Sequence, residues 1–121
     1  MKRILVVEDT EDNRQIMRDL LTSVGYELIE ATNGADGVAM AKQHKPDLIL
    51  MDIQLPVLDG YEATRQIKAD AALRAVPIIA VTSYALAGDE AKTRAAGCDA
   101  YIAKPFSPRQ LLAKVRELLP E

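Results

Sequence analysis

The feature that most restricts how this chain can fold is a regular alternation of short apolar runs with helical patterns. The apolar runs are RILVV (3–7), ELIEA (27–31), DLILM (47–51), PIIAVT (77–82) and AYIA (100–103). Three of these runs are nearly continuous in Val, Ile, Leu or Ala, which is typical of parallel strands that are covered on both faces. The sequence therefore predicts five strands of a parallel sheet.

Helical patterns separate the runs and follow the last one. The apolar positions that define the first, third and fifth helices are Ile16, Met17, Leu20, Leu21 and Val24, then Tyr61, Thr64 and Ile67, and then Leu111, Leu112, Val115, Leu118 and Leu119. A second helix is predicted over 35–45 and a fourth over 87–96. The fourth has only small apolar residues, Ala91 and Ala95, so we expect little buried area to anchor it.

Helix ends are also marked in the sequence. Gly25 and Gly97 are expected to end the first and fourth helices, because glycine readily adopts the left-handed conformation found just past a helix. SPRQ at 107–110 predicts the start of the fifth helix, with a capping box and a proline in the first position.

Strict alternation of strand and helix with short connections predicts an α/β fold with helices on both faces of the sheet. Five units are too few for an eight-stranded barrel. We therefore predict a doubly wound, flavodoxin-like (βα)5 arrangement with the strand order 2-1-3-4-5, in which the crevice at the C-terminal ends of the first and third strands binds ligands. With 121 residues, the chain is expected to form one domain over 1–121.

Composition excludes several classes of function. A net charge of −3 without any basic run argues against direct nucleic-acid binding. The chain lacks the roughly 18 consecutive apolar residues of a membrane span, and the apolar run at its start is shorter than the roughly 7–15 residues of a secretory signal, so we expect a cytoplasmic protein. With Cys98 and His44 as its only cysteine and histidine, no internal disulfide or thiolate zinc cluster is possible, and a histidine triad is not expected.

Polar side chains follow four of the five predicted strands. Glu8 and Asp9 follow the first, Asp52 the third, Thr82 and Ser83 the fourth, and Lys104 with Pro105 the fifth. Because the C-terminal ends of neighbouring parallel strands meet at one edge of the sheet, three carboxylates, a lysine and a hydroxyl are predicted in one small volume.

Carboxylates this close together require either a protonated acid or a bound cation. An all-oxygen ligand set without sulfur or imidazole favours Mg²⁺. The charges of three carboxylates, Lys104 and one Mg²⁺ would then cancel. An aspartate between a metal ion and a lysine can attack phosphorus, so Asp52 is the candidate nucleophile. Taken singly, Asp52 could instead cap a local turn, and Glu8 and Asp9 could be acids favoured by a helix N-terminus.

Four motifs at these same positions resemble the receiver domain of two-component response regulators. They are VVED (6–9), LILMDIQLP (48–56) followed by DG (59–60), AVTSYA (80–85) and YIAKPF (101–106). The resemblance extends over the whole chain. Since the sequence ends directly after the fifth helix, we expect the stand-alone, single-domain type.

The resemblance implies a role for each residue of the cluster. Asp52 is expected to be the phosphoacceptor, and Glu8 and Asp9 the acidic pair that holds Mg²⁺, with Asp9 as the more direct partner. The backbone carbonyl of Gln54 is expected to complete the protein ligands of the metal. Lys104 is expected to contact the phosphoryl group.

The resemblance also implies a switch. Thr82 is expected to bond the phosphoryl group once it is attached, and Tyr101 to turn inward when Thr82 moves. Gln54 and Tyr84 are positions that influence the lifetime of the acyl phosphate, and a bulky Tyr84 predicts slow self-dephosphorylation. A cis peptide bond between Lys104 and Pro105 is also expected.

The function that follows is a phosphorylation-driven signalling switch rather than an enzyme with turnover on an external substrate. The expected partners are a sensor histidine kinase or a histidine phosphotransfer protein, and a downstream protein target that binds the face made by the helix over 87–96, the strand over 100–103 and the last helix. No direct partner is expected among nucleic acids or membranes.

Two alternatives stay open from the sequence. A metal-dependent phosphohydrolase with an aspartate nucleophile commonly carries a second acid two residues after the nucleophile, where this chain has Gln54. A flavin- or nucleotide-binding module would need a phosphate cradle rich in Gly, Ser or Thr after the first strand, where this chain has EDTEDN.

Overall fold

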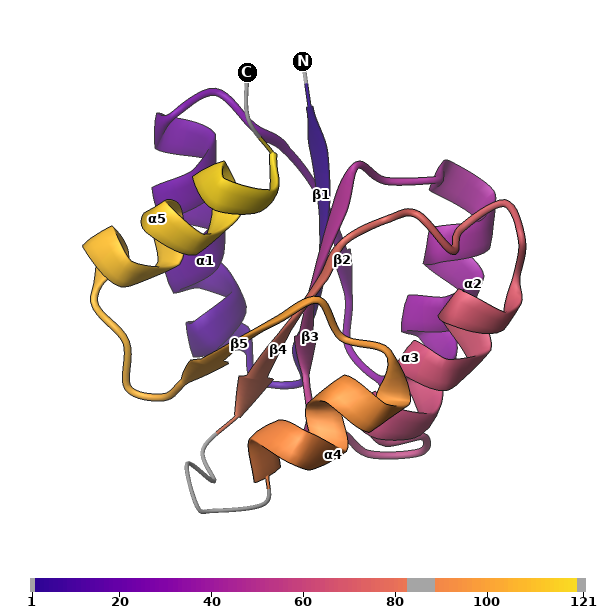
Figure 1. Ribbon diagram of the computed structural model, residues 1–121. Coiled ribbons are helices and arrows are strands. Elements are labelled where there is room, and N and C mark those ends of the chain that lie inside the picture. The colour runs from indigo at the N-terminus through magenta and orange to yellow at the C-terminus, as the bar shows by residue number, and fades with distance from the viewer. Residues whose placement is uncertain (1, 83–88, 120–121) are drawn as a thin grey trace.

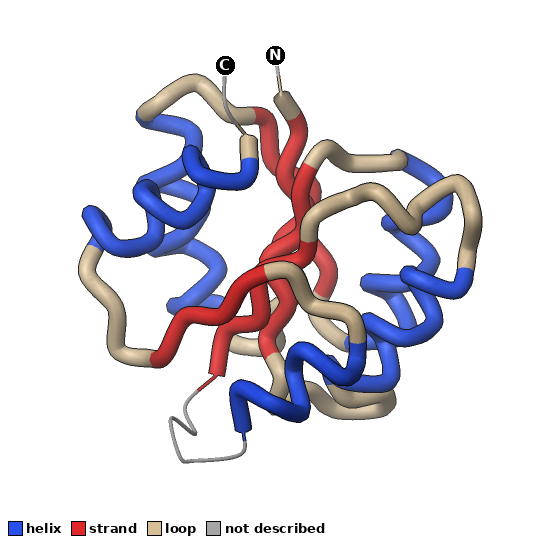
Figure 2. Tube along the Cα trace, in the orientation of Figure 1, coloured by secondary structure: helices blue, strands red, loops and turns tan. Residues whose placement is uncertain are grey.

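The structure, a computed structural model, describes residues 2–82 and 89–119 and has a parallel five-stranded sheet at its centre (Figures 1 and 2). The strand order is β2-β1-β3-β4-β5, which confirms the predicted doubly wound topology. The strands are β1 (Arg3–Val7), β2 (Glu27–Ala31), β3 (Leu48–Asp52), β4 (Ile78–Thr82) and β5 (Ala100–Ala103). Each begins and ends within one residue of its predicted bounds.

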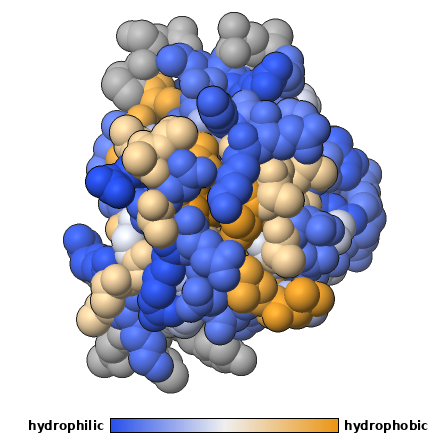
Figure 3. Space-filling view, turned by 90° about the vertical axis from the view of Figure 1, so that its right-hand side faces the viewer, coloured by the Kyte–Doolittle hydropathy of each residue, from blue (hydrophilic) through white to orange (hydrophobic). Residues whose placement is uncertain are grey.

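Helices cover both faces of the sheet. They are α1 (Glu11–Ser23), α2 (Gly34–His44), α3 (Gly60–Ala69), α4 (Asp89–Ala96) and α5 (Pro108–Leu118). Figure 1 shows α1 and α5 together on one face and α2, α3 and α4 on the other. The outer surface over α2 and α3 is mainly hydrophilic (Figure 3), as expected for helices that bury one side only.

Two hydrophobic clusters, one on each face, hold the sheet and helices together. Leu5 and Val7 of β1 pack toward α2 and α3, whereas Ile4 and Val6 pack toward α1 and α5. All five residues of β3 and of β4 are buried. The continuous apolar runs in the sequence are therefore explained by strands that have no solvent-facing side.

The pairing of the strands brings their ends to a common edge. Val7 pairs with Met51, so the next residues along the two strands, Glu8 and Asp52, are neighbours. Thr82 pairs with Ala103, so Lys104 lies one residue beyond Thr82. The polar residues that follow the apolar runs are thus placed together by the register of the sheet.

The predicted helix ends are confirmed. Gly25 and Gly97 have φ angles of 95° and 110°, and Ser107 forms a capping box with Gln110 at the start of α5. The start of α4 at Asp89 agrees with the prediction as far as the structure describes it, because residues 83–88 lie outside the described ranges.

One prediction about α4 was wrong. Ala91 and Ala95, which were expected to anchor this helix, are exposed, whereas Thr93 and Ala96 are buried. The buried side of α4 is the one that packs against α3 and β5, and an alanine has too little apolar area to decide which side that is. None of the helices that the structure describes has the length and apolar character needed to span a membrane.

Candidate functional site

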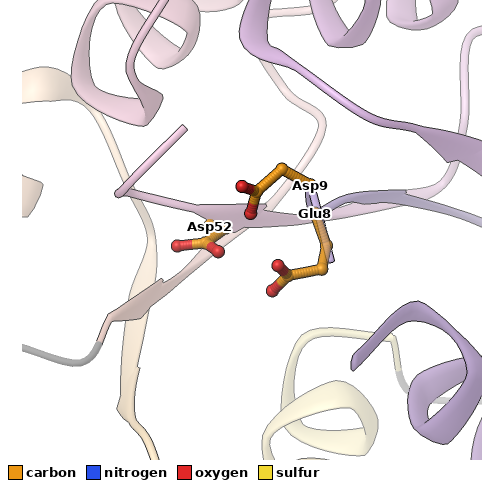
Figure 4. Close-up of side chains that lie close together, drawn as sticks. All are labelled: Glu8, Asp9 and Asp52. Carbon is orange, nitrogen blue, oxygen red and sulfur yellow. The ribbon is translucent and has the colours of Figure 1, made fainter. Parts of the chain in front are cut away.

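Three carboxylates meet at the C-terminal edge of the sheet. Glu8 and Asp9 follow β1 directly, and Asp52 is the last residue of β3. Figure 4 shows the three side chains directed toward a common space, and one carboxylate oxygen of each lies within 4.8 Å of the other two. The convergence that the sequence predicted is therefore present.

Two of these acids are buried and hydrogen-bonded. Glu8 is 1 % exposed and Asp52 3 % exposed, and Lys104 Nζ donates to Glu8 Oε1 at 2.9 Å and to Asp52 Oδ2 at 3.1 Å. The second oxygens accept from backbone N–H groups, Glu8 Oε2 from Thr10 at 3.1 Å and Asp52 Oδ1 from Gln54 at 3.0 Å. These charge-assisted bonds offset the cost of burying the carboxylates.

The two buried acids have opposite pKa shifts. Burial, together with a hydrogen bond to Glu8 and the charge of Glu8, raises the pKa of Asp52 to about 6 against the opposing effect of Lys104. Burial also acts to raise the pKa of Glu8, but hydrogen bonds with Asp52 and Lys104 outweigh it and leave that pKa below its usual value. In the metal-free site, the first proton that the pair of acids binds as the pH falls is therefore bound by Asp52.

Lys104 stays charged in this surrounding. Burial acts to lower the pKa of its ammonium group, but the hydrogen bond to Glu8 and the charges of Asp52 and Glu8 raise it above the usual value. The structure has the predicted cis peptide bond between Lys104 and Pro105. The site thus combines a fixed cation, a fixed anion and an aspartate that can exchange a proton for a metal ion.

The donor set fits Mg²⁺. Three carboxylates offer oxygen atoms, which this ion prefers, and the space between them is shared by all three. Asp9 is exposed, whereas both oxygens of Glu8 already accept hydrogen bonds. The expectation that Asp9 is the more direct ligand stays a prediction. The part assigned to the backbone carbonyl of Gln54 stays a prediction.

Thr82 lies beside the acids at the end of β4. It is fully buried, and its Oγ1 accepts a hydrogen bond of 2.9 Å from Gln54 Nε2.

Tyr101 lies on β5, where it pairs with Ala80. It lines an open groove of about 410 Å³ with side chains of α5 that include Lys114. Its inward rotation stays a prediction. Ser83 and Tyr84 lie outside the described residues, so the predicted slow self-dephosphorylation that was based on Tyr84 stays a prediction.

Sequence reasoning missed three contacts that shape this site. Arg14 Nη1 donates to the Glu8 carbonyl at 2.9 Å, Gln54 bonds Thr82 as described, and Gly60 lies against the end of β3. A Cβ at Gly60 would overlap the carbonyl oxygen of Asp52 and the Cα of Ile53, so only glycine lets α3 begin there. The DG pair at 59–60 was the sequence signal for this contact.

A second groove lies next to Lys104. It has a volume of about 470 Å³ and is lined by Asn13, Ile16 and Met17 of α1 and by Lys104, Pro105 and Phe106. Ile16 is 57 % exposed. The first helix therefore directs one apolar side chain of its pattern outward, beside the site, rather than into the core.

Known proteins resemble this chain over nearly its whole length. The family described as "Response regulator receiver domain" matches residues 4–116. The polar-differentiation response regulator DivK of Brucella anthropi is 46% identical over 118 residues, which are 98% of this chain and 96% of that protein. DivK of Brucella ovis is 45% identical with the same coverage.

Solved structures agree with this fold. The receiver domain of the sensor histidine kinase PA1611 from Pseudomonas aeruginosa superposes with a TM-score of 0.92 at 41% identity, over 99% of this chain and 98% of that one, and has a magnesium ion coordinated in its active site cleft. A putative response regulator from Chloroflexus aurantiacus gives a TM-score of 0.94 at 26% identity with the same coverage.

Proposed function

Because this chain belongs to the response regulator receiver domain family, we propose that it is a switch in which Asp52 accepts a phosphoryl group from a phosphohistidine. The observation that carries this proposal is the cluster at the sheet edge, where carboxylates of β1 and β3 meet within 4.8 Å and Lys104 bonds two of them. The partner would be a sensor histidine kinase or a histidine phosphotransfer protein.

The proposed site binds Mg²⁺ through Glu8, Asp9, Asp52 and the backbone carbonyl of Gln54. When bound, the ion would supply positive charge that offsets the phosphoryl oxygens at the point of transfer. The magnesium ion of the PA1611 receiver domain supports this assignment, because that domain shares the fold and 41% of its residues with this chain.

In the transfer step, a carboxylate oxygen of Asp52 attacks phosphorus, the P–O bond forms, and the P–N bond to the donor imidazole breaks. The imidazole leaves with the electron pair of that bond. Lys104 Nζ, which is 3.1 Å from Asp52 Oδ2, remains next to the reacting carboxylate and pairs with a phosphoryl oxygen. The N–H of Gln54, bonded to Asp52 Oδ1, keeps the carboxylate oriented.

Phosphorylation then changes the surroundings of Thr82. The phosphoryl group brings added negative charge and strong acceptor oxygens to Asp52, and the Thr82 hydroxyl can donate to one of them. Tyr101 follows into the space that Thr82 leaves. The response is read on the α4–β5–α5 face by a downstream protein. The buried residues of α4 within 91–96, Thr93 and Ala96, are small, which supports a helix that shifts at low cost.

The site favours a switch over a phosphohydrolase with steady turnover. The residue two positions after Asp52 is Gln54, whose amide bonds Thr82 and cannot act as a general acid. We therefore propose that the chain has no turnover on an external substrate. A single receiver domain over 1–121, a cytoplasmic location, and the absence of direct nucleic-acid or membrane partners complete the proposal.

The test is phosphotransfer from a panel of histidine kinases that carry labelled phosphate, with and without Mg²⁺. We expect label on the wild-type chain in the presence of Mg²⁺, and the Asp52→Asn variant should remain unlabelled because an amide cannot form the acyl phosphate. The Asp19→Asn variant, which removes an exposed acid of α1, should accept label like the wild type. Label on Asp52→Asn would show that the acceptor is another residue.

A further inference from the structure

The Asp9 carboxylate is held differently from the other two acids of the cluster. Lys104 and backbone N–H groups fix Glu8 and Asp52. Within 2–82 and 89–119, no hydrogen bond or ion pair holds the carboxylate of Asp9, which is exposed and yet directed toward Asp52 (Figure 4). Its aim must therefore come from the backbone that carries it.

That backbone is fixed through the peptide unit between Glu8 and Asp9. A peptide unit is planar, so the direction of the Glu8 carbonyl also sets the direction of the Asp9 N–H. The Glu8 N–H donates to the Ala31 carbonyl at 3.0 Å, and the Glu8 carbonyl accepts from Arg14 Nη1 at 2.9 Å. The Glu8 N–H is part of the preceding peptide unit, so the bond from Arg14 is the one that holds the Glu8–Asp9 peptide.

Arg14 is itself held in place. Its side chain is 11 % exposed, its Nη2 pairs with Glu11, and its Nε lies 3.5 Å from Glu30 Oε1 on β2. The planar guanidinium of Arg14 can therefore bond α1, β2 and the Glu8 carbonyl at once, which the single ammonium of a lysine cannot reproduce.

We propose that Arg14 is a positioning residue of the Mg²⁺ site, which holds the Glu8–Asp9 peptide and thereby aims the Asp9 carboxylate at Asp52. This inference rests on the proposed function, because it assumes that the acidic cluster binds Mg²⁺. It adds a residue that touches neither the metal ion nor the phosphoryl group.

Because Arg14 is positively charged, the loss of its positioning contact and the loss of its charge should change the affinity for Mg²⁺ in opposite directions. Removing a positive charge near a cation site should strengthen Mg²⁺ binding by itself. Removing the contact that aims Asp9 should weaken it. Arg18 provides the matched control, because it pairs with Glu11 and Glu30 like Arg14 and no bond joins it to Glu8 among the described residues.

The experiment is calorimetric titration of the unphosphorylated full chain with MgCl₂. We expect Arg14→Ala to weaken Mg²⁺ binding about tenfold, the usual lower range for groups that orient metal ligands. Arg18→Ala should bind as tightly as the wild type or slightly more tightly. Arg14→Lys keeps the charge without the fork of donors and should also bind more weakly than the wild type, and it carries the test if Arg14→Ala fails to fold.

Hydrogen exchange of the metal-free protein gives a second readout. The Thr10 N–H, bonded to Glu8 Oε2, should exchange faster in Arg14→Ala than in the wild type and in Arg18→Ala, because the turn after β1 is released. If Arg14→Ala binds Mg²⁺ as tightly as Arg18→Ala, the positioning role is wrong while the proposed function stands. If the wild type itself does not bind Mg²⁺, both fail.

Discussion

Asp52 and Glu8 are both buried carboxylates at the end of adjacent strands, but they are not equivalent residues. Lys104 Nζ is 2.9 Å from Glu8 Oε1 and 3.1 Å from Asp52 Oδ2, and only the pKa of Asp52 is raised. The proposed nucleophile is thus the acid of the pair that binds a proton first as the pH falls toward 6. Glu8 serves instead as the permanent counter-charge of Lys104.

This inequality predicts that Mg²⁺ binding depends on pH near 6. Below the raised pKa of Asp52, about 6, the ion must displace a proton, so affinity should fall by up to roughly tenfold per pH unit. Above it, Asp52 is already a carboxylate and affinity should level off. Titrations between pH 5 and 8 measure this, and Asp52→Asn, although a weaker binder, should lose the dependence near pH 6. A flat wild-type profile from pH 5 to 7.5 would contradict the prediction.

Single residues also show where sequence reasoning stops. The acids, Thr82 and Lys104 could be predicted because they directly follow apolar runs, and parallel strands place such residues at one edge. The bonds from Arg14 to the Glu8 carbonyl and from Gln54 to Thr82 could not. They depend on side-chain rotamers and on strand register, which the order of residue types does not encode directly.

Among the elements, the strands were predicted most closely and the weakest helix least. Fully buried strands such as β3 and β4 leave a continuous apolar run whose ends are sharp. Among the residues of α4 whose burial is described, 91–96, the buried ones are Thr93 and Ala96, and Ala96 is no more apolar than the exposed Ala91 and Ala95. A helix with so small an apolar side gives no clear periodic signal.

The junction between β3 and α3 supports a prediction about Gly60. Alanine favours a helix over glycine by about 1 kcal/mol, but a Cβ at Gly60 would overlap the backbone of Asp52 and Ile53. The overlap should dominate, because main-chain atoms cannot move aside like a flexible side chain. We therefore expect Gly60→Ala to lower the free energy of unfolding by about 1–3 kcal/mol and to weaken Mg²⁺ binding, since the end of β3 must shift.

Gly25→Ala is the control for this prediction. Gly25 has a φ of 95°, and a Cβ added there would meet no atom within 4 Å, so alanine should cost about 1–2 kcal/mol through backbone conformation alone. It lies just before β2, at the end of the sheet opposite the carboxylates, so Mg²⁺ affinity should not change. Urea denaturation and Mg²⁺ titration of both variants measure the two effects. A Gly60→Ala variant with wild-type stability and affinity would show that the junction adapts.

For the whole molecule, the sheet and its two hydrophobic clusters provide the stability that allows three acids to be gathered at one edge. The strand order could be predicted because alternation, short connections and right-handed crossovers leave few topologies for five strands. The same order makes β1 and β3 neighbours, so the fold itself creates the site. When no cation is bound, the repulsion between the gathered carboxylates offsets part of the stability that the core provides.

This opposition predicts that the Asp52→Asn variant is more stable than the wild type at pH 7.5 in the absence of metal. The folded-state pKa of Asp52 is raised from 3.8 to about 6, so its contribution to stability is complete below about pH 4 and is lost as the pH rises through 6. One pKa unit corresponds to about 1.4 kcal/mol, so we expect the variant to gain about 1–3 kcal/mol at pH 7.5 and much less at pH 5. Saturating Mg²⁺ should narrow the difference in stability between the variant and the wild type at pH 7.5, because the ion stabilises the wild type selectively.

Urea denaturation in EDTA and in MgCl₂ measures both effects, with Asp19→Asn as a control that removes an equal charge from the exposed side of α1. A metal-free Asp52→Asn variant that is less stable than the wild type at pH 7.5 would mean that the acids stabilise this edge even without a cation.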